Sequence, residues 1–99
     1  MSNLHIRPAA LSDVACIHQF IVDLATYERE PDAVLASEDD IRKALFCDSP
    51  RVFALICERQ DPGSEASRAI GFAIYFFNFS TWLGRHGIYL EDLYVTPEA

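Results

Sequence analysis

Two adjacent carboxylates, Glu91 and Asp92, lie inside an apolar run near the end of the chain. The run reads "IYLEDLYV" over residues 88–95, and its aliphatic and aromatic side chains are typical of a β-strand. A carboxylate can accept a proton from an ammonium group, and a neighbouring carboxylate can orient that base or bind another cation. Because successive residues of a regular strand point to opposite faces, we expect that Glu91 and Asp92 do not share one proton. The pair also fits a structural explanation, since charges on an edge strand discourage aggregation.

The composition is that of one folded domain or part of one. The chain has 99 residues, of which 51% are hydrophobic and 12% aromatic, so it can form a core and has no signature of disorder. No apolar run reaches the roughly 18 residues of a membrane span, and the start lacks the pattern of a signal peptide. Three cysteines and three histidines are widely spaced. We therefore expect no disulfide framework, no metal site and a cytoplasmic location.

The net charge of −7 is distributed unevenly along the chain. Residues 27–40, "YEREPDAVLASEDD", hold six acids and one arginine. This acidity argues against a nucleic-acid-binding surface, and it suits a cationic small molecule or a basic partner. A solvated acidic surface around the start of a helix is the plainer alternative.

Periodicity predicts two helices in the first half of the chain. A short strand is expected to end at Pro8, and Ser12 then resembles the N-cap of a helix that runs to Tyr27. Apolar residues at spacings of three and four support this helix: Val14, Ile17, Ile21 and Leu24. The letters "SEDD" from Ser37 match a capping box, which predicts a second helix ending by residues 48–50.

Strand patterns fill the second half of the chain. We expect strands over residues 52–57, 69–79 and 88–95, the first of them covered on both faces. Gly71 marks a bulge or a close approach of two backbones. Because the links between these strands are short, antiparallel pairing is favoured. The predicted fold is α/β, of the α+β kind, with the order β-α-α-β-β-β and a mainly antiparallel sheet.

Several segments in this order resemble one known family. They are "IRPA" (6–9), "LATYERE" (24–30), "IGFAIYFF" (70–77), Trp82 and "YLEDLYVTPE" (89–98). Together they resemble the GCN5-related N-acetyltransferase (GNAT) superfamily, nearest its diamine (spermidine/spermine) and thialysine acetyltransferase branch. The resemblance covers essentially the whole of residues 1–99. It implies an enzyme that moves an acetyl group from acetyl-CoA to a primary amine of a small molecule, which could be a diamine, a polyamine or an amino acid.

The resemblance implies roles for the residues of the last strand. Glu91 would be the base that takes the proton of the amine, and Asp92 would orient it or bind a second ammonium. The backbone of Leu93, Tyr94 and Val95 would hold the pantetheine of acetyl-CoA and polarise the thioester carbonyl.

The resemblance also implies an amine site formed by Tyr27, Glu28 and Trp82. Without it, a tyrosine at a helix end and a tryptophan in a loop are more often packing residues. Polyamine-specific members carry an acid just before this tryptophan, whereas this chain reads "FSTW" at residues 79–82. The departure weakens the expectation of a long polyamine and leaves a shorter diamine, thialysine or another small amine open.

In this family the closing strand is followed by a glycine-rich loop that binds the acetyl-CoA pyrophosphate, and the sequence ends at Ala99, where that loop would begin. We therefore expect residues 1–99 to be the N-terminal portion of one acetyltransferase domain, inactive on its own. An exposed last strand would favour a homodimer or a strand-swapped assembly. Two alternatives are a non-catalytic binding or assembly module with this half-fold, and an unrelated α+β sandwich.

Overall fold

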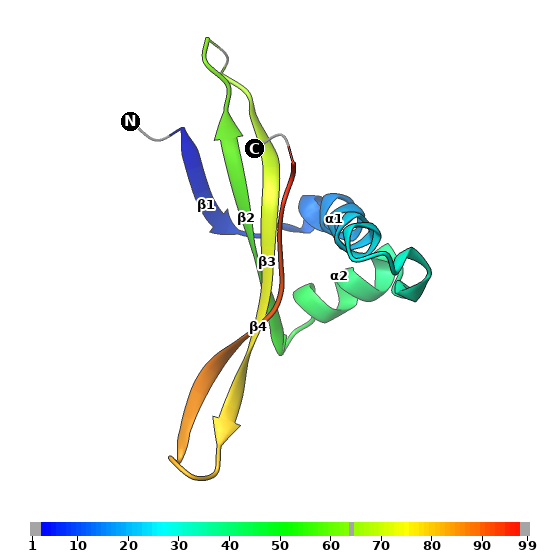
Figure 1. The fold of residues 1–99 in the computed structure, drawn as a ribbon. Coiled ribbons are helices and arrows are strands. Elements are labelled where there is room, and N and C mark those ends of the chain that lie inside the picture. The colour runs from blue at the N-terminus through cyan, green and yellow to red at the C-terminus, as the bar shows by residue number, and fades with distance from the viewer. Residues whose placement is uncertain (1–2, 64, 98–99) are drawn as a thin grey trace.

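The computed structural model describes residues 3–63 and 65–97. Two helices and a four-stranded antiparallel sheet of order β1-β2-β3-β4 make up this part of the chain (Figure 1). The elements are β1 (Leu4–Pro8), the 3-10 turn η1 (Leu11–Asp13), α1 (Val14–Tyr27), the 3-10 turn η2 (Pro31–Ala33), α2 (Glu38–Phe46), β2 (Val52–Gln60), β3 (Ser67–Ser80) and β4 (Arg85–Val95). The predicted order β-α-α-β-β-β and the antiparallel pairing are confirmed. Ser64 of the expected loop and Glu98 and Ala99 of the closing motif lie outside the described residues.

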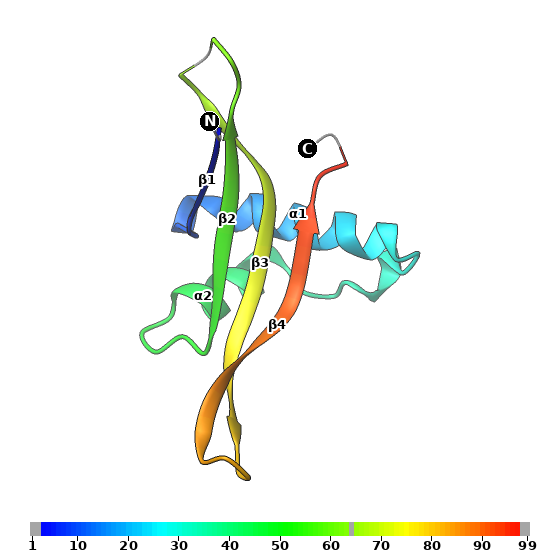
Figure 2. The same cartoon turned by 60° about the vertical axis from the view of Figure 1, so that its left-hand side comes forward.

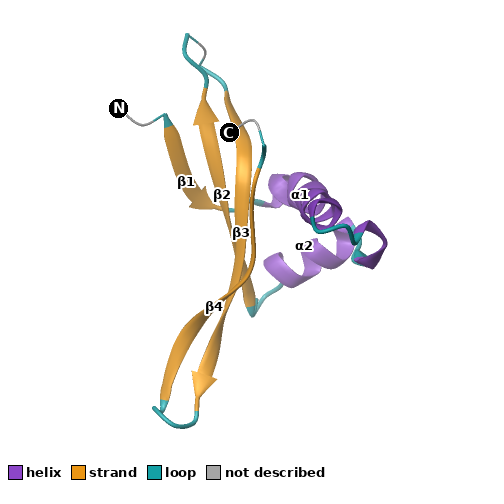
Figure 3. Cartoon of the chain, viewed as in Figure 1, coloured by secondary structure: helices purple, strands orange, loops and turns teal. Residues whose placement is uncertain are grey.

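Both helices pack against the same face of the sheet (Figures 1 and 2). The core lies between them and this face and contains Ile17, Phe20, Leu45, Ala54, Ile56, Phe72 and Ile74. The opposite face, which we call the open face, has no helix over it in the described part of the chain (Figure 3). The expectation that β2 is covered on both faces is therefore wrong, because its open-face residues Phe53 and Leu55 are only partly buried. No helix of the described residues is long and apolar enough to span a membrane.

The start of α1 differs from the prediction. Ser12 does not cap the helix, because it lies inside η1, where the Asp13 N–H donates to the Ala10 carbonyl at 2.8 Å. The buried Asp13 carboxylate accepts hydrogen bonds from the Ala10 N–H and from two nitrogens of the Arg7 guanidinium. Arg7 also donates to Glu58 at 2.9 Å. This network fixes the turn from β1 into α1.

The predicted capping box of α2 is confirmed. The Asp40 N–H donates to Ser37 Oγ at 3.1 Å, and the Ser37 N–H donates to the Asp40 carboxylate at 2.9 Å. Both bonds satisfy N–H groups that the first turn of a helix leaves without partners. The helix ends at Phe46, close to the predicted end.

The close backbone approach predicted at Gly71 is confirmed. A Cβ atom at this position would lie 2.7 Å from the Tyr94 carbonyl oxygen, so β3 and β4 could not pair as they do with a larger residue. The register of β2 against β3 shifts beside this glycine, where Ile70 is an extra residue in β3.

The far halves of β3 and β4 form a two-stranded arm that extends past the helices (Figure 2). The turn at its tip is held by the Gly84 N–H, which donates to the Ser80 carbonyl at 2.8 Å, and by the Leu83 N–H, which donates to Ser80 Oγ. Gly84 has φ +66°, a conformation that glycine adopts without strain. The arm gives the molecule its longest dimension, 51 Å.

Candidate active site

A groove of about 570 Å³ lies between the C-terminal half of α1 and the end of β4. It is lined by Asp23, Leu24, Thr26, Tyr27, Leu93, Tyr94, Val95 and Pro97. The helix is held at this distance from the strand by Phe20, whose ring lies 5.6 Å from that of Tyr94 and 5.7 Å from that of Phe72. Packing of one aromatic cluster therefore brings the predicted amine-site residue Tyr27 to the three predicted cofactor residues.

The three cofactor candidates alternate along β4. Tyr94 pairs with Phe72 and faces the helices, whereas Leu93 and Val95 pair with Ala73 and Gly71 and face the open side. The Thr96 N–H donates to the Ile70 carbonyl at 2.7 Å, inward to β3. Because N–H directions alternate along a strand, those of Leu93 and Val95 point to the outer edge, where the described sheet has no further strand. These two donors fit an extended ligand with carbonyl groups, such as pantetheine.

A bulge in β4 falls on Glu91. Ile74 pairs with Asp92 and Tyr75 pairs with Leu90, so Glu91 is an extra residue without a counterpart in β3. The premise that these two acids alternate in a regular strand is therefore wrong. The bulge reverses the phase of the strand: Leu90 lies on the open face with Tyr75, and Asp92 lies on the helix face with Ile74.

The Asp92 carboxyl lies within electrostatic reach of Glu91 and of Glu28. Partial burial raises the pKa of the Asp92 carboxyl above its ordinary value, and the negative charges of Glu91 and Glu28 raise it further. The C-terminal end of α1 thus brings Glu28 toward the β4 acids. An ammonium group beside Asp92 would offset the repulsion that this carboxylate feels.

The end of α1 presents Tyr27 and Glu28 to solvent. The Glu30 N–H donates to the Ala25 carbonyl at 2.8 Å and the Arg29 N–H donates to the Thr26 carbonyl at 3.0 Å, which is a Schellman motif. Arg29 occupies the left-handed position of this motif with φ +64°. Tyr27 is 82% exposed, so its ring is an accessible wall of the groove and is not part of the core.

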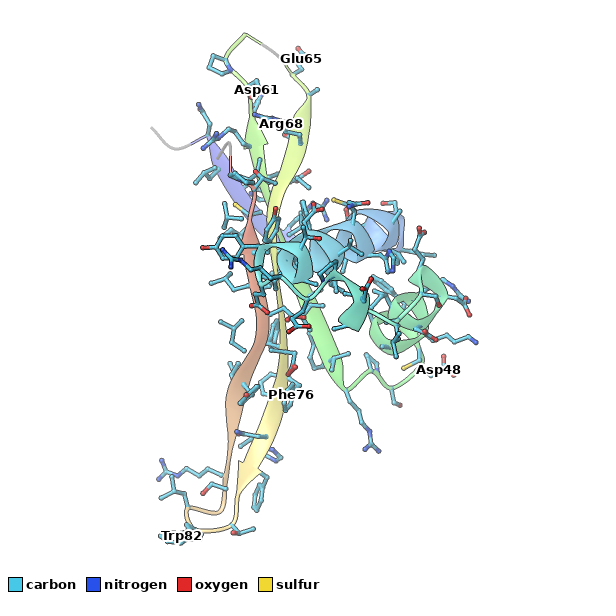
Figure 4. The ribbon with its side chains drawn as sticks, turned by 45° about the vertical axis from the view of Figure 1, so that its right-hand side comes forward. Asp48, Asp61, Glu65, Arg68, Phe76 and Trp82 are labelled. Carbon is cyan, nitrogen blue, oxygen red and sulfur yellow. The ribbon has the colours of Figure 1, made fainter. Side chains whose placement is uncertain are left out.

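Trp82 lies elsewhere. It is 96% exposed at the tip of the β3–β4 arm, well away from the helices (Figure 4). The structure of a single copy does not bring this predicted amine-site residue to the groove. Its role in amine binding stays a prediction.

Sequence reasoning missed Asp23, Leu24, Thr26 and Pro97 as lining residues of the groove. Asp23 precedes Tyr27 by four residues, the spacing that places two side chains on the same helix face, and this was the available signal. Among residues 3–63 and 65–97, no three histidine, cysteine or acidic side chains gather as a metal site would require.

The fold and the groove define an α+β domain with an open strand edge beside a helix end. Proteins found to be similar to this chain include acetyltransferases. No family model matches the sequence. The chain is 40% identical to a thialysine N-epsilon-acetyltransferase of Sus scrofa over 100 residues, covering 99% of this chain and 58% of the relative. It is 35% identical over 97 residues to a spermidine/spermine N(1)-acetyltransferase-like protein 1 of Homo sapiens, covering 97% of this chain and 14% of that protein.

Solved structures agree on the fold. An aminoglycoside acetyltransferase from an uncultured soil metagenomic sample, in complex with sisomicin, superposes with a TM-score of 0.68 at 14% identity, covering 97% of this chain and 58% of that one. A ribosomal-protein-alanine N-acetyltransferase from Brucella melitensis superposes with a TM-score of 0.64 at 17% identity, with the same coverage. The fold corresponds to the N-terminal part of the GCN5-related N-acetyltransferase fold, and the sequence is similar to acetyltransferases named for thialysine. It spans about 58% of the length of the thialysine acetyltransferase that it matches.

Proposed function

We propose that the protein takes part in acetyl transfer from acetyl-CoA to a primary amine of a small molecule. The observation that carries this proposal is the groove in which Tyr27 of α1 meets Leu93–Val95 of β4. The similarity to acetyltransferases, including one named for thialysine, supports the same reaction class. Because the chain spans only part of its relatives, the activity is proposed for the whole protein.

In this proposal residues of β4 bind the cofactor and accept the proton, and residues at the end of α1 bind the amine. Acetyl-CoA supplies the activated acetyl group. The outward N–H groups of Leu93 and Val95 hold its pantetheine and polarise the thioester carbonyl, an effect worth about 3 kcal/mol where such donors have been removed from other enzymes. Tyr27 and Glu28 hold the amine. The amine reacts only when deprotonated, and Glu91 accepts its proton directly or through water.

Titration of the 99-residue chain with acetyl-CoA, followed by the amide resonances of β4, tests the cofactor part of this proposal. We expect concentration-dependent shifts at Leu93, Tyr94 and Val95 and none in β1 on the other edge of the sheet. Coenzyme A without the acetyl group serves as a control for the thioester contact. A spectrum that acetyl-CoA leaves unchanged would contradict cofactor binding by Leu93, Tyr94 and Val95 within residues 1–99.

Replacing Glu91 with Gln tests the assignment of the base. The amide cannot accept a proton, so the amine must lose its proton to water, which becomes harder as the pH falls. In a preparation of the whole protein that transfers acetyl groups, we expect the variant to lose most rate at low pH and least at high pH. A pH–rate profile of unchanged shape would rule out Glu91 as the base.

We also propose that the protein forms a homodimer or strand-swapped assembly. Large apolar side chains on the open face support this proposal. A cytoplasmic location likewise stays a prediction.

A further inference from the structure

Arg29 is the one residue other than glycine with a left-handed backbone among residues 3–63 and 65–97. It lies at the end of α1, in the position of the Schellman motif that favours glycine. Glycine would adopt this conformation without strain, so the stability of the fold does not select an arginine here. A cation near the C-terminal end of a helix is favourable, but it would act equally from a neighbouring residue with ordinary backbone angles. Strained positions of this kind are concentrated at functional sites.

The backbone of Arg29 lies directly beside the groove. Its N–H donates to the Thr26 carbonyl at 3.0 Å, and Thr26 and Tyr27 both line the groove. The long side chain of Arg29 therefore starts two residues beyond Tyr27, whose ring is exposed at the same helix end. The described lining includes no lysine or arginine, so Arg29 is the cation closest along the chain to a lining residue.

The guanidinium of Arg29 is available to an anion from outside the chain. Arg29 is exposed, and it is the one basic residue of the acidic segment 27–40. Glu28 and Glu30 are its neighbours in the chain, but among the described residues its guanidinium forms no ion pair within 4.0 Å. An arginine in this state can bind the carboxylate of a ligand through two parallel N–H groups.

The end of α1 thus carries one anionic and one cationic side chain in succession. The charge of Glu28 raises the pKa of Asp92, so Glu28 lies within electrostatic reach of the acids of β4, where the proposed amine reacts. Arg29 directly follows Glu28 and offers the opposite charge. Leu24 and Leu93 of the groove are apolar and suit a methylene chain that joins an amine to a carboxylate.

We infer that Arg29 is a specificity-determining residue that binds the carboxylate of an amino-acid substrate whose side-chain amine accepts the acetyl group. The inference rests on the proposed function and narrows its substrate class from small amines in general to amino acids with an amine on the side chain.

The test compares a carboxylate with its amide. The 99-residue chain is titrated with 6-aminohexanoate and with 6-aminohexanamide, which share the amine and the methylene chain and differ in the charge of the other end. Dissociation constants are obtained from the amide resonances of Tyr27 and its neighbours. We expect Arg29→Gln to weaken binding of the carboxylate about fivefold, the scale of one solvent-accessible ion pair, and to leave the dissociation constant of the amide unchanged. Arg29→Lys should retain part of the affinity for the carboxylate.

Arg85→Gln is the matched control, because it removes the same charge from an exposed residue of the β3–β4 arm, outside the groove. Equal weakening of 6-aminohexanoate by both variants would reduce the effect to net charge and overturn the inference. Equal weakening of both ligands by Arg29→Gln would show a structural role and also overturn it.

Two further outcomes separate the inference from the proposed function. Weaker binding of acetyl-CoA by Arg29→Gln would assign the guanidinium to a phosphate of the cofactor and overturn the substrate contact. If Arg29→Gln leaves the affinity for both 6-aminohexanoate and its amide unchanged, Arg29 binds no carboxylate, and the amine site survives. If the wild-type chain binds neither ligand, the proposed function fails together with the inference.

Discussion

At the scale of single residues, the main feature of the candidate site is the position of its carboxylates. Glu91 occupies a bulge, where it has no counterpart in β3, and Asp92 is turned toward the helix face next to the core residue Ile74. Partial burial works against the charge of Asp92, while Glu91 remains exposed to solvent. Glu91 and Asp92 are neighbouring carboxylates in different environments. In the proposed reaction, one strand can therefore supply both the base and a group that orients it.

Replacing Asp92 with Asn tests this environment through stability. The pKa of Asp92 is raised in the folded chain, so folding favours the protonated form: its contribution is fully present below the unfolded pKa and is lost as the pH rises through the folded pKa. We therefore expect the variant to be more stable than the wild type at pH 7, by less than about 1 kcal/mol because the side chain is partly solvated.

Urea unfolding at pH 7 and at pH 3 measures the effect. The advantage of Asp92→Asn should shrink at pH 3, where the wild-type carboxyl is also neutral in the folded chain. Asp32→Asn, on an exposed turn, provides the comparison for a simple change of net charge. An advantage that does not depend on pH would contradict the assignment to burial of the Asp92 charge.

At the scale of elements, the end of α1 decides where the amine-site residues lie. The helix stops because Arg29 adopts the left-handed conformation and closes a Schellman motif. An L-residue with a Cβ atom resists this conformation by about 1–2 kcal/mol, whereas glycine does not. This unfavourable conformation of Arg29 lies directly after Tyr27 and Glu28, whose side chains are exposed at the end of the helix.

Arg29→Gly should therefore stabilise the fold by about 0.5–1 kcal/mol, after allowing for the greater entropy of glycine in the unfolded chain. Arg29→Ala is the matched control, since it removes the same side chain and keeps the Cβ atom. We expect a gain in the urea midpoint for glycine alone. If both variants shift the midpoint equally, the effect comes from the arginine side chain and not from its backbone.

Elements could be predicted from the sequence because their signals are local. The capping box at Ser37 and the period of α1 depend on residues close in the chain. The approach at Gly71 involves the distant Tyr94, but a glycine inside a strand is itself the signal for it. The bulge at Glu91 could not be predicted, because it arises from the register of β4 against β3. Asp23 was missed as a groove residue because a lone acid on a helix is usually exposed to solvent. Only the packing of β4 beside α1 makes it part of the groove.

At the scale of the whole molecule, the two faces of the sheet are unequal. The helix face holds the core. The open face holds the partly buried Leu55 and exposes other large apolar side chains: Ile6, Phe77, Ile88, Leu90, Leu93 and Val95. Two hollows of about 210 and 390 Å³ lie on this face. Contiguous apolar surface of this kind is uncommon on soluble monomers and marks a contact surface.

We expect a second copy of the chain to cover the open face in the proposed homodimer. Sedimentation equilibrium over a range of concentrations should show a dimer, because pairing two such faces removes apolar surface from water. Leu90→Lys places a charge at the centre of the face beside Phe77 and Ile88 and should shift the equilibrium to the monomer. Leu35→Lys makes the same change at a 90% exposed leucine between the helices and should leave the dimer intact. A wild-type chain that sediments as a monomer at every concentration would contradict self-association through this face.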